Sequence, residues 1–168
     1  MRPIKYSIYM NIAIELARAS TCRVHVGCVV VGPDGIIHGL GYNGSLPGHP
    51  HCEDVGCDFD EHGHCKATLH AERNALRRAG EKARNGIAFV THFPCPDCAK
   101  ELVDYGISAV LFQNDYRRSP ISVRILERAH IRVLPFTEMK EESFIQLEEQ
   151  IGWRKPTKGG TAEWTNRT

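Results

Sequence analysis

Excess charge and long hydrophobic runs are both missing from this sequence. Its 168 residues include 21 lysines and arginines against 20 aspartates and glutamates, a formal net charge of +1 at pH 7. That balance argues against a protein that binds nucleic-acid phosphates stably. No apolar segment approaches the ~18 residues of a membrane-spanning helix, and residues 1–6 lack the apolar core of a signal peptide. We therefore expect a cytoplasmic protein with neither a nucleic-acid nor a membrane partner.

Disulfide bonds are not expected, although the chain has seven cysteines. A chain of this length can bury roughly 70 % of its unfolded surface, so its core needs no covalent cross-link. The cysteines are odd in number and grouped, since residues 51–72 alone hold three cysteines and four histidines. In a reducing compartment such grouping is typical of metal ligands. Cys28 is an exception, because it lies inside an apolar run and is expected in the core.

Hydrophobic periodicity predicts an α/β protein. Apolar residues recur at helical spacing in residues 6–19, and two β-branched runs flank a Gly-Pro-Asp-Gly turn in a hairpin predicted at 26–44. From residue 87 onward strands and helices alternate, which indicates parallel strands with crossover helices. The expected fold is a three-layer α/β/α arrangement with a mixed sheet of about five strands. The further strands are expected at 87–93, 107–113 and 131–136, and the further helices at 70–79, 96–106, 119–130 and 137–152.

Helix caps and one long loop complete the predicted organisation. Ser119 and Thr137 are the expected N-caps of the last two helices. Residues 43–69 have no periodicity and are rich in Gly, Pro, Asp, His and Cys, which predicts a loop that a metal would hold in place. We expect residues 1–150 to form one domain and the polar residues 151–168 to form a flexible tail.

Two short segments carry the residues of a candidate zinc site. His70-Ala71-Glu72 and Pro94-Cys95-Pro96-Asp97-Cys98 each begin a predicted helix. Cysteines three apart at a helix start point their sulfurs to one side, and the helix dipole favours the thiolate that binds zinc. Ligation by His70, Cys95 and Cys98 would leave one tetrahedral position for water, as in catalytic zinc sites, although a Cys-x-x-Cys pair alone also occurs in structural ones. Glu72 is close enough to carry the water's proton without binding the metal.

The combination of His-x-Glu with Pro-Cys-x-x-Cys is the signature of zinc nucleobase deaminases. Four further segments narrow the resemblance: residues 20–31, Gly-Tyr-Asn-Gly at 41–44, the cysteine loop ahead of 68–76, and Asn-Asp-Tyr-Arg-Arg at 114–118. With these segments the chain resembles, over roughly residues 6–135, the deoxycytidylate (dCMP) deaminases of the cytidine-deaminase-like superfamily, and most closely their bacterial and phage branch. The free-nucleoside cytidine deaminases differ, because they carry cysteine at the position of His70 and lack the cysteine loop.

The resemblance implies zinc-dependent hydrolytic deamination of dCMP to dUMP and ammonia. Water activated by the metal would attack C4 of the pyrimidine, and Glu72 would carry its proton. The substrate would be a small-molecule nucleotide. Two other functions remain open from the sequence: deamination of another nucleotide or nucleobase, such as dCTP or a base in RNA, and an inactive zinc-binding module.

Candidate substrate contacts also follow from the resemblance. The backbone N–H of Ala71 would hold the base, Asn43 would read the sugar hydroxyl, and Tyr116 would flank the base. Arg23 and Arg117 are candidates for the 5′-phosphate, since a guanidinium forms bidentate charge-assisted bonds to phosphate. The alternative for both arginines is an ordinary surface cation.

Apart from Cys28, four cysteines are left over from the candidate catalytic site. They would close a tetrahedral structural site without water, and similar enzymes carry a second zinc in this region with a cysteine after the first helix as one ligand. The hypothesis is a second zinc on Cys22, Cys52, Cys57 and Cys65. Two alternatives stay open: a histidine ligand, with His49, His51 and His64 as candidates, or a core role for Cys22 and a loop that binds no metal.

Regulation is implied by the resemblance alone. Relatives are often homo-hexamers that dCTP activates and dTTP inhibits, with Mg²⁺, at a separate site that includes the Gly-Tyr-Asn-Gly loop. The candidate allosteric contacts are therefore Gly41, Tyr42, Asn43 and Gly44, although the same glycines could simply form the turn.

The remaining histidines have no partners in the pattern and are expected to be surface or core residues: His25, His38, His62, His92 and His130.

Overall fold

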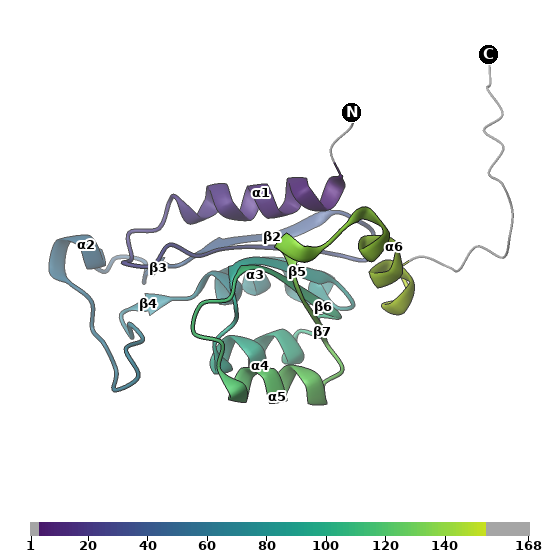
Figure 1. Ribbon diagram of the computed structural model, residues 1–168. Coiled ribbons are helices and arrows are strands. Elements are labelled where there is room, and N and C mark those ends of the chain that lie inside the picture. The colour runs from purple at the N-terminus through teal and green to yellow at the C-terminus, as the bar shows by residue number, and fades with distance from the viewer. Residues whose placement is uncertain (1–3, 154–168) are drawn as a thin grey trace, which may run out of the picture.

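The computed structural model describes residues 4–153 and confirms a mixed five-stranded sheet with helices on both faces (Figure 1). The strand order is β2-β1-β5-β6-β7, and a separate two-stranded sheet pairs β3 with β4. The strands are β1 Gly27–Val31, β2 Ile37–Tyr42, β3 Gly44–Ser45, β4 Thr68–Leu69, β5 Ile87–His92, β6 Ala109–Asn114 and β7 Arg132–Pro135. The helices are α1 Lys5–Ala17, α2 Cys52–Val55, α3 Ala71–Ala79, α4 Pro96–Asp104, α5 Pro120–Arg128 and α6 Glu141–Gln150, with 3₁₀ turns η1 Gly80–Ala83 and η2 Phe136–Glu138.

The predicted hairpin and the predicted parallel strands are both confirmed. β1 is antiparallel to β2 and to β5, with Val29 opposite Phe89, whereas β5, β6 and β7 are mutually parallel, with Phe89 opposite Leu111. β1 is buried along its whole length, because helices cover both faces of the sheet. Cys28 is fully buried there, as expected.

Side chains of alternate strand residues build two cores, one on each face of the sheet. One core joins Val30, Val90 and Val110 to α3, α4 and α5 through residues such as Leu76, Leu102 and Leu126. The other joins Val29, Phe89 and Leu111 to α1 and α6 through Met10 and Leu147. Figure 1 shows α1 on one side of the sheet and α4 and α5 on the other. Each face of the central strands is therefore covered by helices.

Glycine on β2 permits an unusually close approach of α3. A Cβ atom at Gly41 would lie 2.3 Å from the carbonyl oxygen of Ala71 and 2.5 Å from the backbone nitrogen of Ala75. Any larger residue would therefore push the helix away from the strand. This contact fixes the start of α3 against the sheet.

Some expected boundaries differ from the structure. Ser119 is confirmed as an N-cap, since its Oγ accepts the N–H of Ile121 at 3.2 Å, but Thr137 is not a cap. Residues 136–138 form η2, and α6 begins only after Lys140. A proline before residue 136 and the acidic first turn at Glu141 fit this later start. The helices that begin at Lys5 and Pro96 end two residues earlier than predicted.

The segment 43–69 is more ordered than a structureless loop. It contains β3, α2, β4 and an antiparallel bridge between Phe59 and Cys65.

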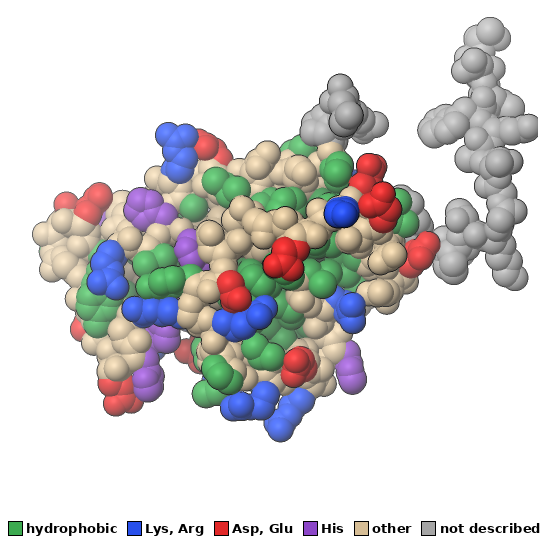
Figure 2. Space-filling view, in the orientation of Figure 1, with side chains coloured by type: hydrophobic (Ala, Val, Ile, Leu, Met, Phe, Trp, Pro, Cys, Tyr) green, Lys and Arg blue, Asp and Glu red, His purple; other side chains and the backbone are tan. Residues whose placement is uncertain are grey.

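Acidic and basic side chains are interspersed over the face of the molecule drawn in Figure 2, which matches the near-zero net charge. Among the described helices, none combines the length and the apolar character needed to cross a membrane.

Candidate metal centre and substrate pocket

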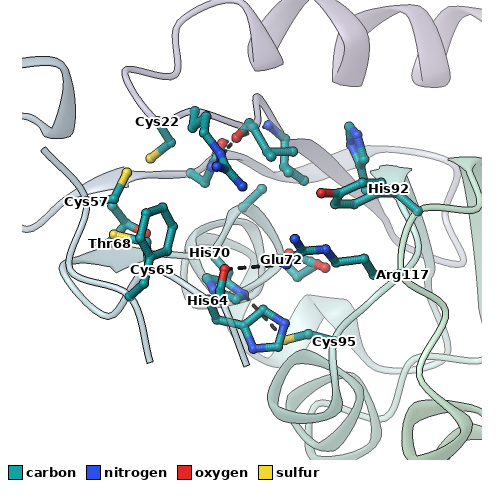
Figure 3. Close-up of a pocket in the computed structure, with 18 of the residues that line it drawn as sticks. Cys22, Cys57, His64, Cys65, Thr68, His70, Glu72, His92, Cys95 and Arg117 are labelled. Atoms are coloured by element: carbon teal, nitrogen blue, oxygen red, sulfur yellow. Dashed lines mark hydrogen bonds between the residues drawn. The ribbon is translucent and has the colours of Figure 1, made fainter. Parts of the chain in front are cut away.

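The sheet topology brings five separate segments to one edge. The carboxyl ends of the parallel strands β5 and β6 lie at this edge, and they are followed by Cys95 and by Tyr116. Because β1 runs antiparallel to β5, its amino end and the preceding Arg23 lie at the same edge. His70, the N-cap of α3, lies at the same pocket as these residues. Together with part of the cysteine loop, these segments line one pocket (Figure 3).

The pocket contains a cluster of three potential metal ligands. His70 and Cys95 are the N-cap residues of α3 and α4, and Cys98 lies in the first turn of α4. Their ligand atoms all lie within 4.8 Å of one another. The Nδ1 atom of His70 lies 3.3 Å from the Sγ of Cys98 and 3.4 Å from the Sγ of Cys95. Nδ1 is therefore the nitrogen that faces the two sulfurs.

The titration behaviour of the three side chains is strongly linked. Hydrogen bonds from Cys98 and His70 lower the pKa of Cys95 to about 4. The adjacent Cys95 sulfur, with burial, raises the pKa of Cys98 well above its ordinary value, and the hydrogen bond to Cys95 raises the pKa of His70 to about 9. Cys95 is therefore the more readily ionised of the two cysteines, and its sulfur faces both the thiol of Cys98 and the imidazole of His70.

These donors fit a zinc ion. Zinc binds thiolates and a neutral imidazole, and three protein ligands are the usual number in catalytic sites. A divalent cation would satisfy both thiolates at once and displace the proton from His70. The structure therefore provides a three-ligand set with the right chemistry and spacing for this metal.

Glu72 lies beside this cluster and is 4 % exposed. Burial raises the pKa of its carboxyl group, the positive charge of His70 opposes that effect, and the side chain also interacts with the thiol of Cys98. Ala71, the first residue of α3, lines the pocket too. N–H groups in the first turn of a helix have no partner within the helix, so they can bind a ligand. The pocket therefore holds a buried carboxyl group and backbone donors next to the three potential metal ligands.

A second cluster consists of three cysteines from the loop. The Sγ atoms of Cys52, Cys57 and Cys65 lie within 4.8 Å of one another, with 3.7 Å between those of Cys52 and Cys65. Burial and the neighbouring thiols raise the pKa of Cys52 to about 12. Against its own burial, backbone hydrogen bonds from Ala67 and Asp58 lower the pKa of Cys65. The thiol of Cys65 is therefore more readily ionised than the thiol of Cys52.

Cys22 lies next to this cluster but outside its 4.8 Å limit. Figure 3 shows its sulfur facing that of Cys57, and burial, with the charges of Cys57 and Cys65, raises its pKa. Among the described residues, no histidine joins the three sulfurs within this limit. His51 instead contacts the hydroxyl of Thr21 at 3.0 Å. Cys22 is thus a candidate for a fourth ligand.

Both arginines proposed for the phosphate line the pocket, and each contacts an aromatic ring. The guanidinium of Arg23 lies 5.2 Å from the ring centroid of Phe59. That of Arg117 lies 5.2 Å from the ring centroid of Tyr116, and its Nη1 donates to the carbonyl of Gly63 at 3.4 Å. These contacts hold two cations at the pocket, which also contains the Tyr116 side chain.

Asn43 lines the pocket, but its amide already serves the backbone. Its Oδ1 accepts the N–H of Val26 at 2.8 Å, and its Nδ2 donates to the carbonyl of Val24 at 2.7 Å. It therefore fixes the segment that carries Arg23. The other residues of the Gly-Tyr-Asn-Gly segment do not line this pocket. Close packing against the backbone of α3 accounts for glycine at position 41.

Sequence reasoning missed several pocket residues. Phe59, Thr68, His92 and Phe93 line the pocket. The sequence predicts a surface or core residue at His92, whereas the structure places it in the pocket lining, where its ring meets that of Tyr116 edge to face with centroids 6.0 Å apart. Its position at the carboxyl end of a strand was the available signal. Phe59 had no such signal, because it lies in an irregular loop.

The chain is similar to known proteins in sequence. The family profile of the cytidine and deoxycytidylate deaminase zinc-binding region matches residues 3–114. ComE operon protein 2 of Bacillus subtilis is 38 % identical over 122 residues, which are 70 % of this chain and 64 % of that protein. The deoxycytidylate deaminase of Saccharomyces cerevisiae is 34 % identical over 155 residues, which are 88 % of this chain and 49 % of that protein. The chain thus spans less than two thirds of these two relatives.

A solved structure supports the same relationship. The dCMP deaminase of cyanophage S-TIM5, in complex with dCMP and dUMP, is 32 % identical and superposes with a TM-score of 0.64 over 79 % of this chain and 97 % of that one. Its apo form gives the same TM-score at 28 % identity. The sequence profile and this likeness lead to one conclusion. The chain belongs to the cytidine and deoxycytidylate deaminase family.

Proposed function

We propose that this protein is a zinc-dependent hydrolase that converts dCMP and water to dUMP and ammonia. The observation that carries the proposal is the placement of the buried Glu72 beside the ligand set of His70, Cys95 and Cys98 in one pocket. A zinc ion bound there would lower the pKa of water, so that a nucleophile is available at neutral pH. The residues of the chain account for the proton transfers and for the position of the substrate.

Glu72 is the proton carrier in this proposal. Its carboxylate accepts a proton from the attacking water and delivers it to N3 of the pyrimidine, and a second transfer lets the 4-amino group leave as ammonia. Burial raises the pKa of Glu72, which helps the protonated state to form during the reaction. The backbone N–H groups at the start of α3, including that of Ala71, hold the base.

The substrate is a nucleoside monophosphate in this proposal. Arg23 and Arg117 lie in the pocket and supply the positive charge that a 5′-phosphate needs. Tyr116 flanks the base, and Asn43 contacts the sugar with the hydrogen-bonding capacity that its backbone contacts leave. The cyanophage enzyme, which resembles this chain in fold and sequence, has been solved with dCMP and dUMP.

A substrate panel tests the proposal. The ultraviolet change from cytosine to uracil and the release of ammonia are measured with dCMP, dCTP, deoxycytidine and a cytosine-containing oligonucleotide. We expect dCMP to have the highest kcat/KM. Equal values for dCMP and deoxycytidine would refute the phosphate contacts, and turnover of none of the four compounds would refute the deaminase.

A second zinc on Cys22, Cys52, Cys57 and Cys65 is part of the proposal. Its support is the sulfur cluster of three loop cysteines with Cys22 beside it. Elemental analysis should give about two zinc ions per chain for the wild type, as two four-coordinate sites require. The substitution Cys22→Ser should lower the content towards one. Two retained ions in that variant would exclude Cys22 as a ligand.

Assembly and regulation complete the proposal. The protein would assemble as a homo-hexamer, with a single deaminase domain over residues 1–150 in each chain. It would be activated by dCTP with Mg²⁺ and inhibited by dTTP, both bound at residues 41–44. Its location would be the cytoplasm, where zinc-binding thiolates persist. The resemblance of residues 41–44 to the family motif is the support for the effectors. Sedimentation measures the assembly. Rates against dCMP concentration, with and without each effector, measure the regulation, and rates that do not respond would exclude it.

A further inference from the structure

The cysteine loop contains a short hairpin that reaches the substrate pocket. Phe59 and Cys65 form an antiparallel bridge, and residues 60–63 make the turn between them. Cys57 and Cys65, at the two ends of the hairpin, belong to the loop cysteine cluster. The segment of residues 57–65 is called the pocket hairpin below. Its two ends meet at this cluster, and Phe59, Gly63 and His64 line the pocket.

Several hydrogen bonds make the pocket hairpin a defined structure. The Oδ1 atom of Asp60 accepts the N–H groups of His62 at 3.0 Å and His64 at 2.8 Å. The backbone N–H of Gly63 donates to the carbonyl of Asp60 at 2.9 Å. The Nζ atom of Lys66 lies 2.9 Å from Oδ2 of the same carboxylate. One aspartate therefore ties the turn to both of its flanks.

The tip and one edge of the pocket hairpin contact the two arginines of the pocket. The ring of Phe59, which is 47 % exposed, stacks with the guanidinium of Arg23. The carbonyl of Gly63 accepts from Nη1 of Arg117. Figure 3 shows the Arg117 side chain extended across the pocket towards the side where Cys57 and Cys65 lie. Two cations from distant parts of the chain thus meet one hairpin.

The contact between Gly63 and Arg117 is close, and both residues have a positive φ. A Cβ atom at Gly63 would lie 3.3 Å from Nη1 of Arg117, and Gly63 has a φ of +75°, which other residues adopt with strain. Arg117 itself has a φ of +51°, a conformation that is uncommon for a residue with a side chain. Such backbone strain is typical of functional sites, where the surrounding structure maintains it.

We propose that the pocket hairpin positions Arg23 and Arg117, so that Phe59 and Asp60 are positioning residues for recognition of the 5′-monophosphate. Arg23 and Arg117 line the same pocket, and two like charges in one pocket repel each other when no anion is bound. Ring stacking and the Gly63 carbonyl offset this repulsion and keep both guanidinium groups ordered before the phosphate arrives. Ordering them in advance lowers the entropy cost of binding. This inference rests on the proposed function.

The test separates phosphate recognition from catalysis. Values of kcat and KM are measured for wild type and Phe59→Leu with dCMP and with deoxycytidine. We expect Phe59→Leu to raise KM for dCMP about two- to fivefold, the loss expected for one exposed cation–π contact, with kcat largely retained. The kcat/KM for deoxycytidine should stay the same. Val55→Ala, a truncation on α2 in the same loop but outside the pocket, is the matched control and should change neither.

A double-substitution cycle shows whether Phe59 acts through Arg23. Phe59→Leu is combined with Arg23→Gln, and the dissociation constant of dCMP is measured by calorimetry in a Glu72→Gln background, where turnover is blocked. We expect Phe59→Leu to have no further effect once Arg23 is replaced. Fully additive effects would overturn the positioning role.

Asp60→Asn gives a second, independent variant. It weakens the turn and the pair with Lys66, so it should raise the dissociation constant of dCMP about as much as Phe59→Leu does. Glu61→Gln removes the neighbouring exposed carboxylate and is its control. Zinc content and the thermal midpoint show that each variant is folded. If wild type prefers dCMP and both variants keep the full preference, the inference fails alone. If wild type has no such preference, the proposed substrate fails with it.

Discussion

Glu72 shows how a single side chain acquires its chemistry from its surroundings. The sequence places it two residues after His70, and the first turn of α3 directs it into the pocket. At 4 % exposure its carboxyl group has lost most of its water, so burial raises its pKa. An ordinary surface glutamate has a lower pKa, so near neutral pH it would rarely hold the proton that a general acid must donate.

The substitution Glu72→Gln tests this role. It keeps the size of the side chain and the hydrogen-bonding capacity but removes the proton-carrying group. We expect kcat for dCMP to fall about 10²- to 10⁴-fold, the usual contribution of a general acid–base group, with zinc content unchanged by elemental analysis. Near wild-type turnover in the variant would exclude Glu72 as the proton carrier.

At the scale of elements, the positions of the proposed metal ligands depend on the starts of two helices. His70 is the N-cap of α3, Cys95 is the N-cap of α4 and Cys98 lies in the first turn of α4, so the relative position of these helices decides the geometry of the cluster. An ion pair links them one turn further along. The Nε atom of Arg73 donates to Oε1 of Glu101 at 2.6 Å, and Nη2 of Arg73 contacts the same oxygen.

Loss of this link should loosen the zinc site. We expect Glu101→Gln to make chelator-driven loss of the catalytic zinc about two- to fivefold faster, because a partly exposed ion pair contributes at most ~1 kcal/mol. Lys100→Gln, which breaks an exposed pair with Asp97 within α4, is the control and should change the rate little. Equal rates for both variants and wild type would show that the pair does not hold the helices together.

The contact of β2 with α3 offers a second test at this scale. We expect Gly41→Ala to lower the free energy of unfolding by about 1–3 kcal/mol, since the new methyl group would overlap the backbone of α3. Gly44→Ala in the same motif is the control, because its Cβ would have only the Tyr42 ring at 3.8 Å. Urea denaturation measures both. Similar losses would mean that backbone freedom, not close packing, explains the glycines.

At the scale of the whole molecule, α1 and α6 cover the face of the sheet opposite to α3, α4 and α5. Glu148 of α6 is 5 % exposed. It accepts from Tyr6 Oη at 2.5 Å and pairs with Nζ of Lys5 at 2.8 Å. The ring of Tyr6 stacks on Phe144 with centroids 4.5 Å apart. These contacts join the two ends of the described chain.

Tyr6→Phe keeps the stacked ring and removes only the hydroxyl. We expect it to lower the free energy of unfolding by about 1.5–3 kcal/mol, the usual range for a hydrogen bond to a charged group, without change in zinc content or in kcat/KM. Tyr9→Phe removes a hydroxyl that donates to the Gly35 carbonyl at 2.7 Å, and should cost about 0.5–1.5 kcal/mol. A larger loss for Tyr9→Phe in urea denaturation would contradict this account of α6.

The sequence by itself determined the local patterns. Period-two and period-3.6 alternation of apolar residues predicted the hairpin, the parallel strands and most helices, because burial on one or both faces must follow those repeats. The spacing of His70, Cys95 and Cys98 indicated metal chemistry, because a helix start presents such residues together. Local patterns did not predict the start of α6. Thr137 is a favourable N-cap residue, but α6 begins at Glu141 and Thr137 lies in η2 instead.

Only the tertiary structure decided which distant residues share the pocket. Nothing near Phe59 in the sequence indicates that it stacks on Arg23, and nothing near Asn43 indicates that its amide is occupied by residues 24 and 26. Such contacts depend on strand order and on the path of an irregular loop, which are set by the packing of the whole chain. Local patterns carry no information about partners that lie tens of residues away, so these contacts appear only when the two cores have formed.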